Sequence, residues 1–119
     1  MIKTLILGAS LHQERYANTA IRRLVHMNFW VVGIGSEEGN IEGVNIYSHE
    51  ISIDDIHTVS IYLNPRNQHG YYDYVIKLNP KRVIFNPGAE NMEFEELLAR
   101  HHIPFERSCT LVLLSTGQF

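Results

Sequence analysis

The chain has one cysteine, Cys109, in 119 residues. A single cysteine excludes an intramolecular disulfide framework and is typical of proteins from a reducing cytoplasm. The sequence also lacks any run of more than two Lys or Arg, and its net charge is −3, so it has no basic tract for nucleic acid. Its apolar runs are too short to span a membrane, and the first of them leads into a polar loop, unlike a signal peptide. We therefore expect a cytoplasmic protein, monomeric or homodimeric, with no nucleic-acid or membrane partner.

Metal-site spacing is absent as well. The seven histidines are scattered, and the neighbours His101 and His102 would point to different sides of a helix. We predict no metal site. The content of 45% hydrophobic and 19% charged residues is that of an ordinary globular protein, and the length corresponds to one domain over residues 1–119.

Apolar, β-branched runs alternate with amphipathic stretches along the whole chain. They predict strands at about 2–7, 30–34, 58–63, 82–85 and 103–106, and helices at about 16–28, 65–78, 92–102 and 109–116. Residues 36–57 are less regular: we expect a turn or short extra β element there, and one helical turn at 51–56. Asn91 and Ser108 are the expected N-caps of the last two helices, and Gly117 the expected stop of the chain's last helix.

This alternation predicts an α/β, Rossmann-like, three-layer fold, with a parallel sheet of about five strands and helices on both faces. We expect the strand order 3-2-1-4-5 or a close relative. In such sheets ligands bind in a crevice at the carboxyl ends of the strands.

The first predicted strand ends in three small residues, Gly8, Ala9 and Ser10. Gly8 has no side chain, so a ligand or another backbone can approach it closely. The following helix directs unpaired N–H groups and a partial positive charge at this loop, and Arg15 stands at its start. The loop therefore suits a phosphate, although a tight turn without a ligand is the simpler alternative.

The other strand ends are also small, polar or proline-bearing. They carry Gly35 and Ser36, Asn64 and Pro65, Asn86, Pro87 and Gly88, and Ser108 and Cys109. Proline holds the residue before it extended, so each asparagine amide would be presented in a fixed direction at the rim. Either Asn-Pro pair alone could be a simple strand-ending turn, but five such ends on one rim favour a binding crevice.

A dinucleotide-binding site fits less well. Ser10 and Gln13 occupy the places of the second and third glycines of the fingerprint. Such a site also needs an acid at the end of the second strand to hold ribose hydroxyls, where this chain has Gly35 and Ser36. Glu37 and Glu38 follow slightly late, so this alternative is weakened but stays open.

Other enzyme classes find little support. A phospho-receiver domain needs an aspartate where Asn64 stands, and Ser10 lacks the glycine two positions later that a hydrolase nucleophile requires. His12, Tyr62 and Cys109 are possible acid–base groups without supporting spacing. At the first turn of a helix Cys109 could be a reactive thiol, but an inert, half-buried thiol is the more economical interpretation.

Several segments together resemble the small stand-alone CoA-binding domain proteins, which are similar to the nucleotide-binding module of the succinyl-CoA synthetase α subunit. The matching segments are Gly8-Ala9-Ser10 with Glu14-Arg15-Tyr16, Ile41-Glu42-Gly43, Tyr62-Leu63-Asn64-Pro65, Arg82 to Gly88, and Cys109-Thr110-Leu111. They cover nearly the whole chain, and the two Asn-Pro pairs are the most specific.

The resemblance implies a Rossmann-like fold that binds CoA or an acyl-CoA along the strand ends. By matching position, Gly8, Ala9, Ser10 and Arg15 would hold phosphates, Gly35 and Ser36 the adenosine end, and the two Asn-Pro pairs the rest of the rim. No second domain, phosphohistidine loop or grasp module accompanies it, so ligase activity is not implied. We expect a non-catalytic CoA-binding module; the alternatives are a small NAD(P)- or nucleotide-dependent enzyme and a regulatory domain with an empty crevice.

Overall fold

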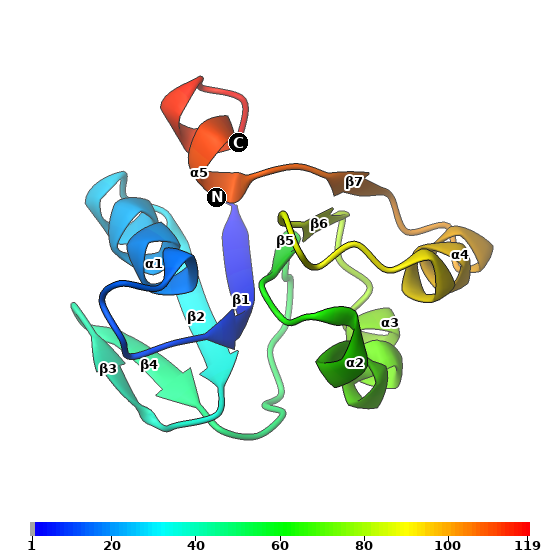
Figure 1. Cartoon of the computed structure of the whole chain (residues 1–119), viewed down its shortest axis with the longest axis horizontal. Helices are drawn as coiled ribbons and strands as arrows, with labels where there is room; N and C mark the ends of the chain where they lie inside the picture. The colour runs from blue at the N-terminus through cyan, green and yellow to red at the C-terminus, as the bar shows by residue number, and fades with distance from the viewer. Residues whose placement is uncertain (1) are drawn as a thin grey trace.

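The computed structural model describes residues 2–119 as one twisted sheet between two layers of helices (Figure 1). The strands are β1 (Lys3–Ala9), β2 (Trp30–Gly35), β3 (Gly39–Ile41), β4 (Val44–Tyr47), β5 (Thr58–Ile61), β6 (Arg82–Phe85) and β7 (Phe105–Arg107). The helices are α1 (Tyr16–His26), α2 (Pro65–Gln68), the 3₁₀ turn η1 (His69–Tyr71), α3 (Tyr72–Leu78), α4 (Met92–Arg100) and α5 (Thr110–Ser115). The predicted α/β, Rossmann-like class is confirmed, with seven strands in place of about five.

The strands lie in the order β3-β4-β2-β1-β5-β6-β7. All neighbouring pairs are parallel except β3 and β4. The five expected strands lie in the order 2-1-3-4-5, a relative of the expected 3-2-1-4-5: residues 58–61, which that order places beside β2, pair with β1. The place beside β2 belongs to β4, which comes from the stretch where only a short extra β element was expected.

The β3–β4 hairpin is formed by a two-residue turn at Glu42 and Gly43. Both residues have positive φ, 48° and 92°, as the hairpin turns that match strand twist require. Ile41 and Val44 flank the turn and are buried. The helical turn expected at 51–56 is not formed: this segment has no regular secondary structure, Asp55 has a positive φ of 61°, and the isoleucines pack on the core.

Alternate residues of β1 face opposite layers, so the core is divided in two. Leu5 and Leu7 pack with α3 and α4, whereas Ile6 packs with α1 and α5. Figure 1 shows α1 on one side of the sheet and α2, α3 and α4 on the other. The small Ala17 and Ala20 on the inner face of α1 are buried in the second cluster or beside it.

Two helix predictions needed correction. The helix expected over 65–78 starts at Pro65 as predicted, but the chain changes to a 3₁₀ turn around Gly70 before α3 begins. Ser108 is not the N-cap of the last helix; Cys109 is, and its side chain makes no capping bond. Asn91 does cap α4, accepting a hydrogen bond from the Phe94 amide at 3.2 Å.

Candidate ligand-binding groove

A groove of about 490 Å³ opens at the carboxyl ends of β1, β2 and β5. This is the rim where parallel α/β sheets bind ligands, and the volume is within the usual range for small-molecule sites. We call it the rim groove. It is lined by Gly8, Ala9, Ser10, His12, Arg15, Tyr16, Ala17, Ser36, Glu37, Tyr62, Leu63, Asn67 and Pro87.

Gly8 forms the floor of the rim groove in a conformation that favours glycine. Its φ is +98°, and the pairing of β1 with β2 shifts between Leu7 and Ala9. A Cβ at Gly8 would lie 2.8 Å from the backbone nitrogen of Leu63. The sequence allowed either a ligand or another backbone to approach Gly8. The structure shows the approach of another backbone, which requires glycine here.

Hydrogen bonds stabilise the loop between β1 and α1, which we call the first loop. The Ser10 hydroxyl accepts a hydrogen bond from the His12 amide at 3.1 Å, and the Ser10 carbonyl accepts one from Asn18 at 3.0 Å. Asn18 is buried on α1 and was not singled out from the sequence. Arg15 occupies the N-cap of α1, where its side chain makes no capping bond and is exposed at the groove wall.

The opposite wall follows β2. Gly35 is packed so closely on β1 that a Cβ there would overlap the Ala9 carbonyl oxygen. Ser36 and Glu37 come next and line the groove. The sequence places the rim at Gly35, but β2 runs through Gly35, so the groove wall begins at Ser36. Glu37 comes two residues after the end of β2, later than the acid of a dinucleotide-binding site was expected, and it is the acidic residue that lines the groove.

Tyr62 contributes an unusual polar group. Its ring packs against the cluster beneath α1, and its hydroxyl oxygen is buried with no hydrogen-bond partner among the described residues. Burial raises the pKa of Tyr62 well above its ordinary value. This phenol stays protonated at neutral pH.

The two Asn-Pro pairs have different roles. Asn86 is 1% exposed, and its amide nitrogen donates to the Ser60 hydroxyl at 2.8 Å and the Ile61 carbonyl at 2.9 Å. Its amide oxygen accepts from the Thr110 amide at 2.8 Å. Asn86 therefore ties β5 and β6 to the start of α5, and these three bonds lie inside the protein. Exposed Asn64 caps α2 by accepting from the Asn67 amide at 3.1 Å.

Six of the predicted site residues line the rim groove and six do not. Those in it are Gly8, Ala9, Ser10, Arg15, Ser36 and Pro87. Those outside its lining are Gly35, Asn64, Pro65, Asn86, Gly88 and Cys109. Cys109 is half-buried at the start of α5, and Gly88 is exposed with φ +95°. Leu63 and Asn67 also line the groove, although they were not predicted as site residues. They belong to the same turn after β5 in which the sequence motif predicted Asn64 and Pro65.

The CoA binding domain family matches residues 3–115 of this chain. The chain belongs to the CoA-binding domain family. A crystal structure of an uncharacterised protein, 44% identical, superposes with a TM-score of 0.96 over 100% of this chain and 98% of that one. A search of curated proteins finds no match.

Two more distant structures share the fold of this CoA-binding domain. The Thermus thermophilus structure of cell-free ID.343 is 19% identical, with a TM-score of 0.86, covering 99% of this chain and 90% of that one. The dinucleotide-forming acetyl-coenzyme A synthetase 1 of Ca. Korarchaeum cryptofilum, in complex with phosphate and ADP, is 21% identical with a TM-score of 0.66. That match covers 83% of this chain and 23% of the synthetase.

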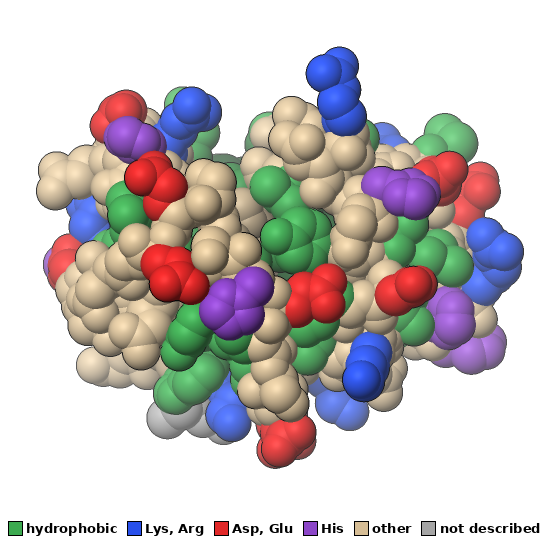
Figure 2. All heavy atoms as spheres, turned by 90° about the horizontal axis from the view of Figure 1, so that it is seen from below, with side chains coloured by type: hydrophobic (Ala, Val, Ile, Leu, Met, Phe, Trp, Pro, Cys, Tyr) green, Lys and Arg blue, Asp and Glu red, His purple; other side chains and the backbone are tan. Residues whose placement is uncertain are grey.

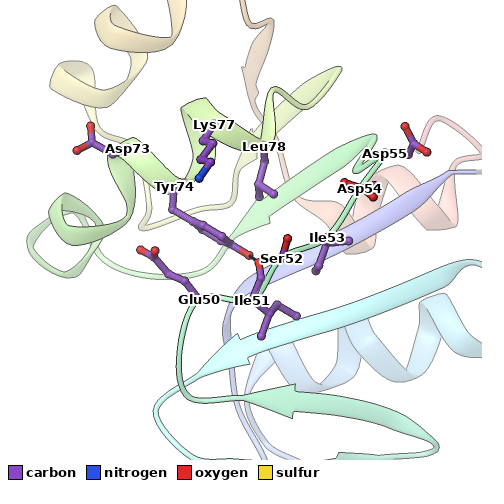
Figure 3. A pocket seen from close by; sticks show the side chains of 10 residues that line it. All are labelled: Glu50, Ile51, Ser52, Ile53, Asp54, Asp55, Asp73, Tyr74, Lys77 and Leu78. Atoms are coloured by element: carbon purple, nitrogen blue, oxygen red, sulfur yellow. Dashed lines mark hydrogen bonds between the residues drawn. The ribbon is translucent and has the colours of Figure 1, made fainter.

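A second hollow of this CoA-binding domain lies between α3 and the segment 50–55 (Figure 3). The Tyr74 side chain reaches from α3 to that segment, and its hydroxyl donates to the Ile51 carbonyl at 2.7 Å. Four carboxylates and one lysine line it: Glu50, Asp54, Asp55, Asp73 and Lys77. This acidic lining disfavours a phosphate-bearing ligand, so the rim groove is the better candidate site.

Charge is mixed over the face shown in Figure 2. Acidic and histidine side chains surround hydrophobic ones at its centre, and Lys and Arg do not gather there. Within residues 2–119 no three His, Cys, Asp or Glu side chains form a group that could hold a metal. No helix in the described part of the chain has the length and apolarity to cross a membrane.

Proposed function

We propose that the rim groove binds CoA or an acyl-CoA without catalysing a reaction on it. The observation that carries this proposal is the match of the CoA binding domain family over residues 3–115, together with a groove built around the first βα turn. In Rossmann-like sheets that turn holds the pyrophosphate of a nucleotide ligand. The adenosine end of CoA would lie toward Ser36, and the pantetheine arm toward Leu63 and Pro87.

The phosphate cradle would combine three features of the first loop. The backbone at Gly8 and Ala9 carries no bulky side chain, the Ser10 hydroxyl lies on the same loop, and α1 starts at the groove with no side chain capping its first amides. Unpaired amides at a helix N-terminus attract anions. Arg15 adds a full positive charge where the pyrophosphate would lie.

A binding role without chemistry is supported by the surroundings of Tyr62. To act as a general base in the groove, Tyr62 would have to release its proton near neutral pH. Its raised pKa disfavours proton release. Cys109, the nucleophile type with the highest intrinsic reactivity, lies outside the groove lining.

CoA at about a hundred times its dissociation constant should stabilise the protein by about 2.7 kcal/mol, an increase in melting temperature on the order of 10 °C. Arg15→Ala should weaken CoA binding by roughly 1–3 kcal/mol because it removes a charge-assisted contact to phosphate. Thermal melting with a CoA titration measures both effects.

Arg23→Ala is the matched control, since Arg23 is an exposed arginine on the same helix but in its last turn. It should leave the CoA titration unchanged. Equal loss of affinity in both variants would mean that only overall charge attracts CoA. No shift with CoA in the unmodified protein would contradict the proposed function itself.

A second candidate is a small NAD(P)-dependent enzyme, and one observation favours it: Glu37 lines the groove after β2, where dinucleotide-binding folds place an acid. Melting with NAD in parallel separates the two. If NAD raises the melting temperature as much as CoA does, the NAD(P)-dependent enzyme is the better candidate. A larger increase with CoA supports the CoA-binding module.

A further inference from the structure

The groove wall after β2, where the adenosine end of CoA would lie, carries an acidic side chain and, among its described residues, no lysine or arginine. Glu37 lines the groove next to Ser36, and its side chain is 64% exposed. Between Arg23 and Arg66 the sequence has no Lys or Arg, so neither β2, the β3–β4 hairpin nor the segment before β5 can supply a fixed positive charge to this wall. Among the described lining residues, the only arginine or lysine is Arg15, on the opposite wall.

Close packing between two loops holds the backbone segment that carries Glu37. A Cβ on Gly39 would lie 2.8 Å from both terminal carbons of Leu11, so the Leu11 side chain rests directly on the Gly39 backbone. One residue further along the first loop, the His12 ring nitrogen lies 3.8 Å from the Glu37 carboxylate. The segment after β2 is thus held against the first loop, with the Glu37 carboxylate near His12.

The adjacent carboxylate points elsewhere. Glu38 lies 3.4 Å from His49 and accepts a hydrogen bond from the Ser48 hydroxyl at 3.2 Å, both on the loop after β4. It is not part of the groove lining. The two neighbouring glutamates are therefore similar in exposure and charge but differ in whether they face the groove.

We propose that Glu37 is a specificity-determining residue that disfavours the ribose 3′-phosphate, so that within the CoA class the groove gains nothing from that phosphate. This inference rests on the proposed function, because it assumes that the adenosine end lies along β2. A carboxylate accepts hydrogen bonds from ribose hydroxyls. The 3′-phosphate of CoA removes one of those donors and brings negative charge against the same carboxylate. Dephospho-CoA, which lacks only that phosphate, should then bind at least as tightly as CoA.

The test is calorimetric titration of CoA and dephospho-CoA into the full chain, Glu37→Gln and Glu38→Gln. Glu37→Gln removes the charge but keeps a hydrogen-bonding side chain of the same size, so CoA should bind roughly three- to tenfold more tightly relative to dephospho-CoA. Glu38→Gln removes an equal charge one residue away and should leave that ratio within about twofold. Melting curves without ligand check that the variants are folded.

The possible outcomes distinguish a failure of this inference from a failure of the proposed CoA binding on which it rests. If both ligands bind but Glu37→Gln changes their ratio no more than Glu38→Gln, the inference is wrong and CoA binding stands. The inference is also wrong if the unmodified protein clearly prefers CoA to dephospho-CoA. If neither ligand binds any of the three proteins, the proposed function is wrong, and the inference with it.

Discussion

Replacing Gly8 by alanine should lower the free energy of unfolding by roughly 3 kcal/mol. Two costs add at this position. The φ of +98° is a conformation that a residue with a Cβ rarely adopts, and the new methyl carbon would lie 2.8 Å from the Leu63 nitrogen and 3.0 Å from the Tyr62 carbonyl carbon. Both contacts are to backbone, so relief requires β1 and the end of β5 to move apart.

Gly43→Ala is the control that separates the two costs. Gly43 has nearly the same φ, +92°, but nothing lies within 4 Å of its Cβ position. Its substitution should therefore show only the conformational cost of about 1 kcal/mol. Denaturant unfolding of the two variants measures the difference. Equal losses would mean that the backbone at Leu63 yields easily, and that the close approach is not what requires glycine at position 8.

The same substitution bears on the rim groove. Gly8 lies at its floor and Leu63 in its wall, so any separation of the two strand ends changes the groove as well as the fold. We therefore expect Gly8→Ala, where it stays folded, to bind CoA more weakly than Gly43→Ala. The site is built from the contact that stabilises the sheet, which links stability and binding at this position.

Local patterns predicted the fold well, and long-range pairing less well. Strand and helix periodicity located β1, β2, β6, α1 and α4, because each is a short segment whose apolar spacing reports its burial. The neighbour of β2 was not located because β4 comes from the irregular stretch, where only a short extra β element was expected, and strand pairing depends on long-range contacts. The isoleucines of residues 51–56 pack on the core without forming a helix.

The groove was predicted only where its residues are close together in the sequence. Gly8, Ser10 and Arg15 belong to one loop, so their sequence neighbourhood suffices to group them. Glu37 was missed as a wall residue because its place depends on how far β2 extends beside β1, which is set by the bulge at Gly8. Asn18 was missed because its bond to the Ser10 carbonyl spans eight residues.

Asn86 shows why equal motifs can have unequal roles. Both Asn-Pro pairs end a strand, and proline extends the asparagine in each. The difference is what lies opposite. Asn64 is at the exposed start of α2, whereas Asn86 faces Ser60 and Thr110, which are 26 and 24 residues away in the sequence. Its oxygen supplies the cap that neither Ser108 nor Cys109 provides for α5.

Asn86→Ala should accordingly destabilise the protein by roughly 2–4 kcal/mol, because the buried Thr110 amide loses its acceptor and two donor bonds are lost with it. Asn64→Ala removes one exposed capping bond and should cost about 1 kcal/mol. Denaturant unfolding of both variants tests this order. Equal losses would contradict it, since they would mean that the buried amide contributes no more than an exposed cap.

Asn86→Asp sharpens the test, because it keeps the size of the side chain and an acceptor for Thr110 but replaces the donor facing the Ile61 carbonyl with an oxygen. Burial and that carbonyl should raise the pKa of the introduced carboxyl above its unfolded value of about 3.9. The folded state then binds the proton more tightly, so the loss of stability relative to the unmodified protein should be smaller at about pH 4 and grow as the pH rises toward 7. A loss that does not change with pH would show that this side chain is hydrated, and that Asn86 is not the buried link between β5, β6 and α5.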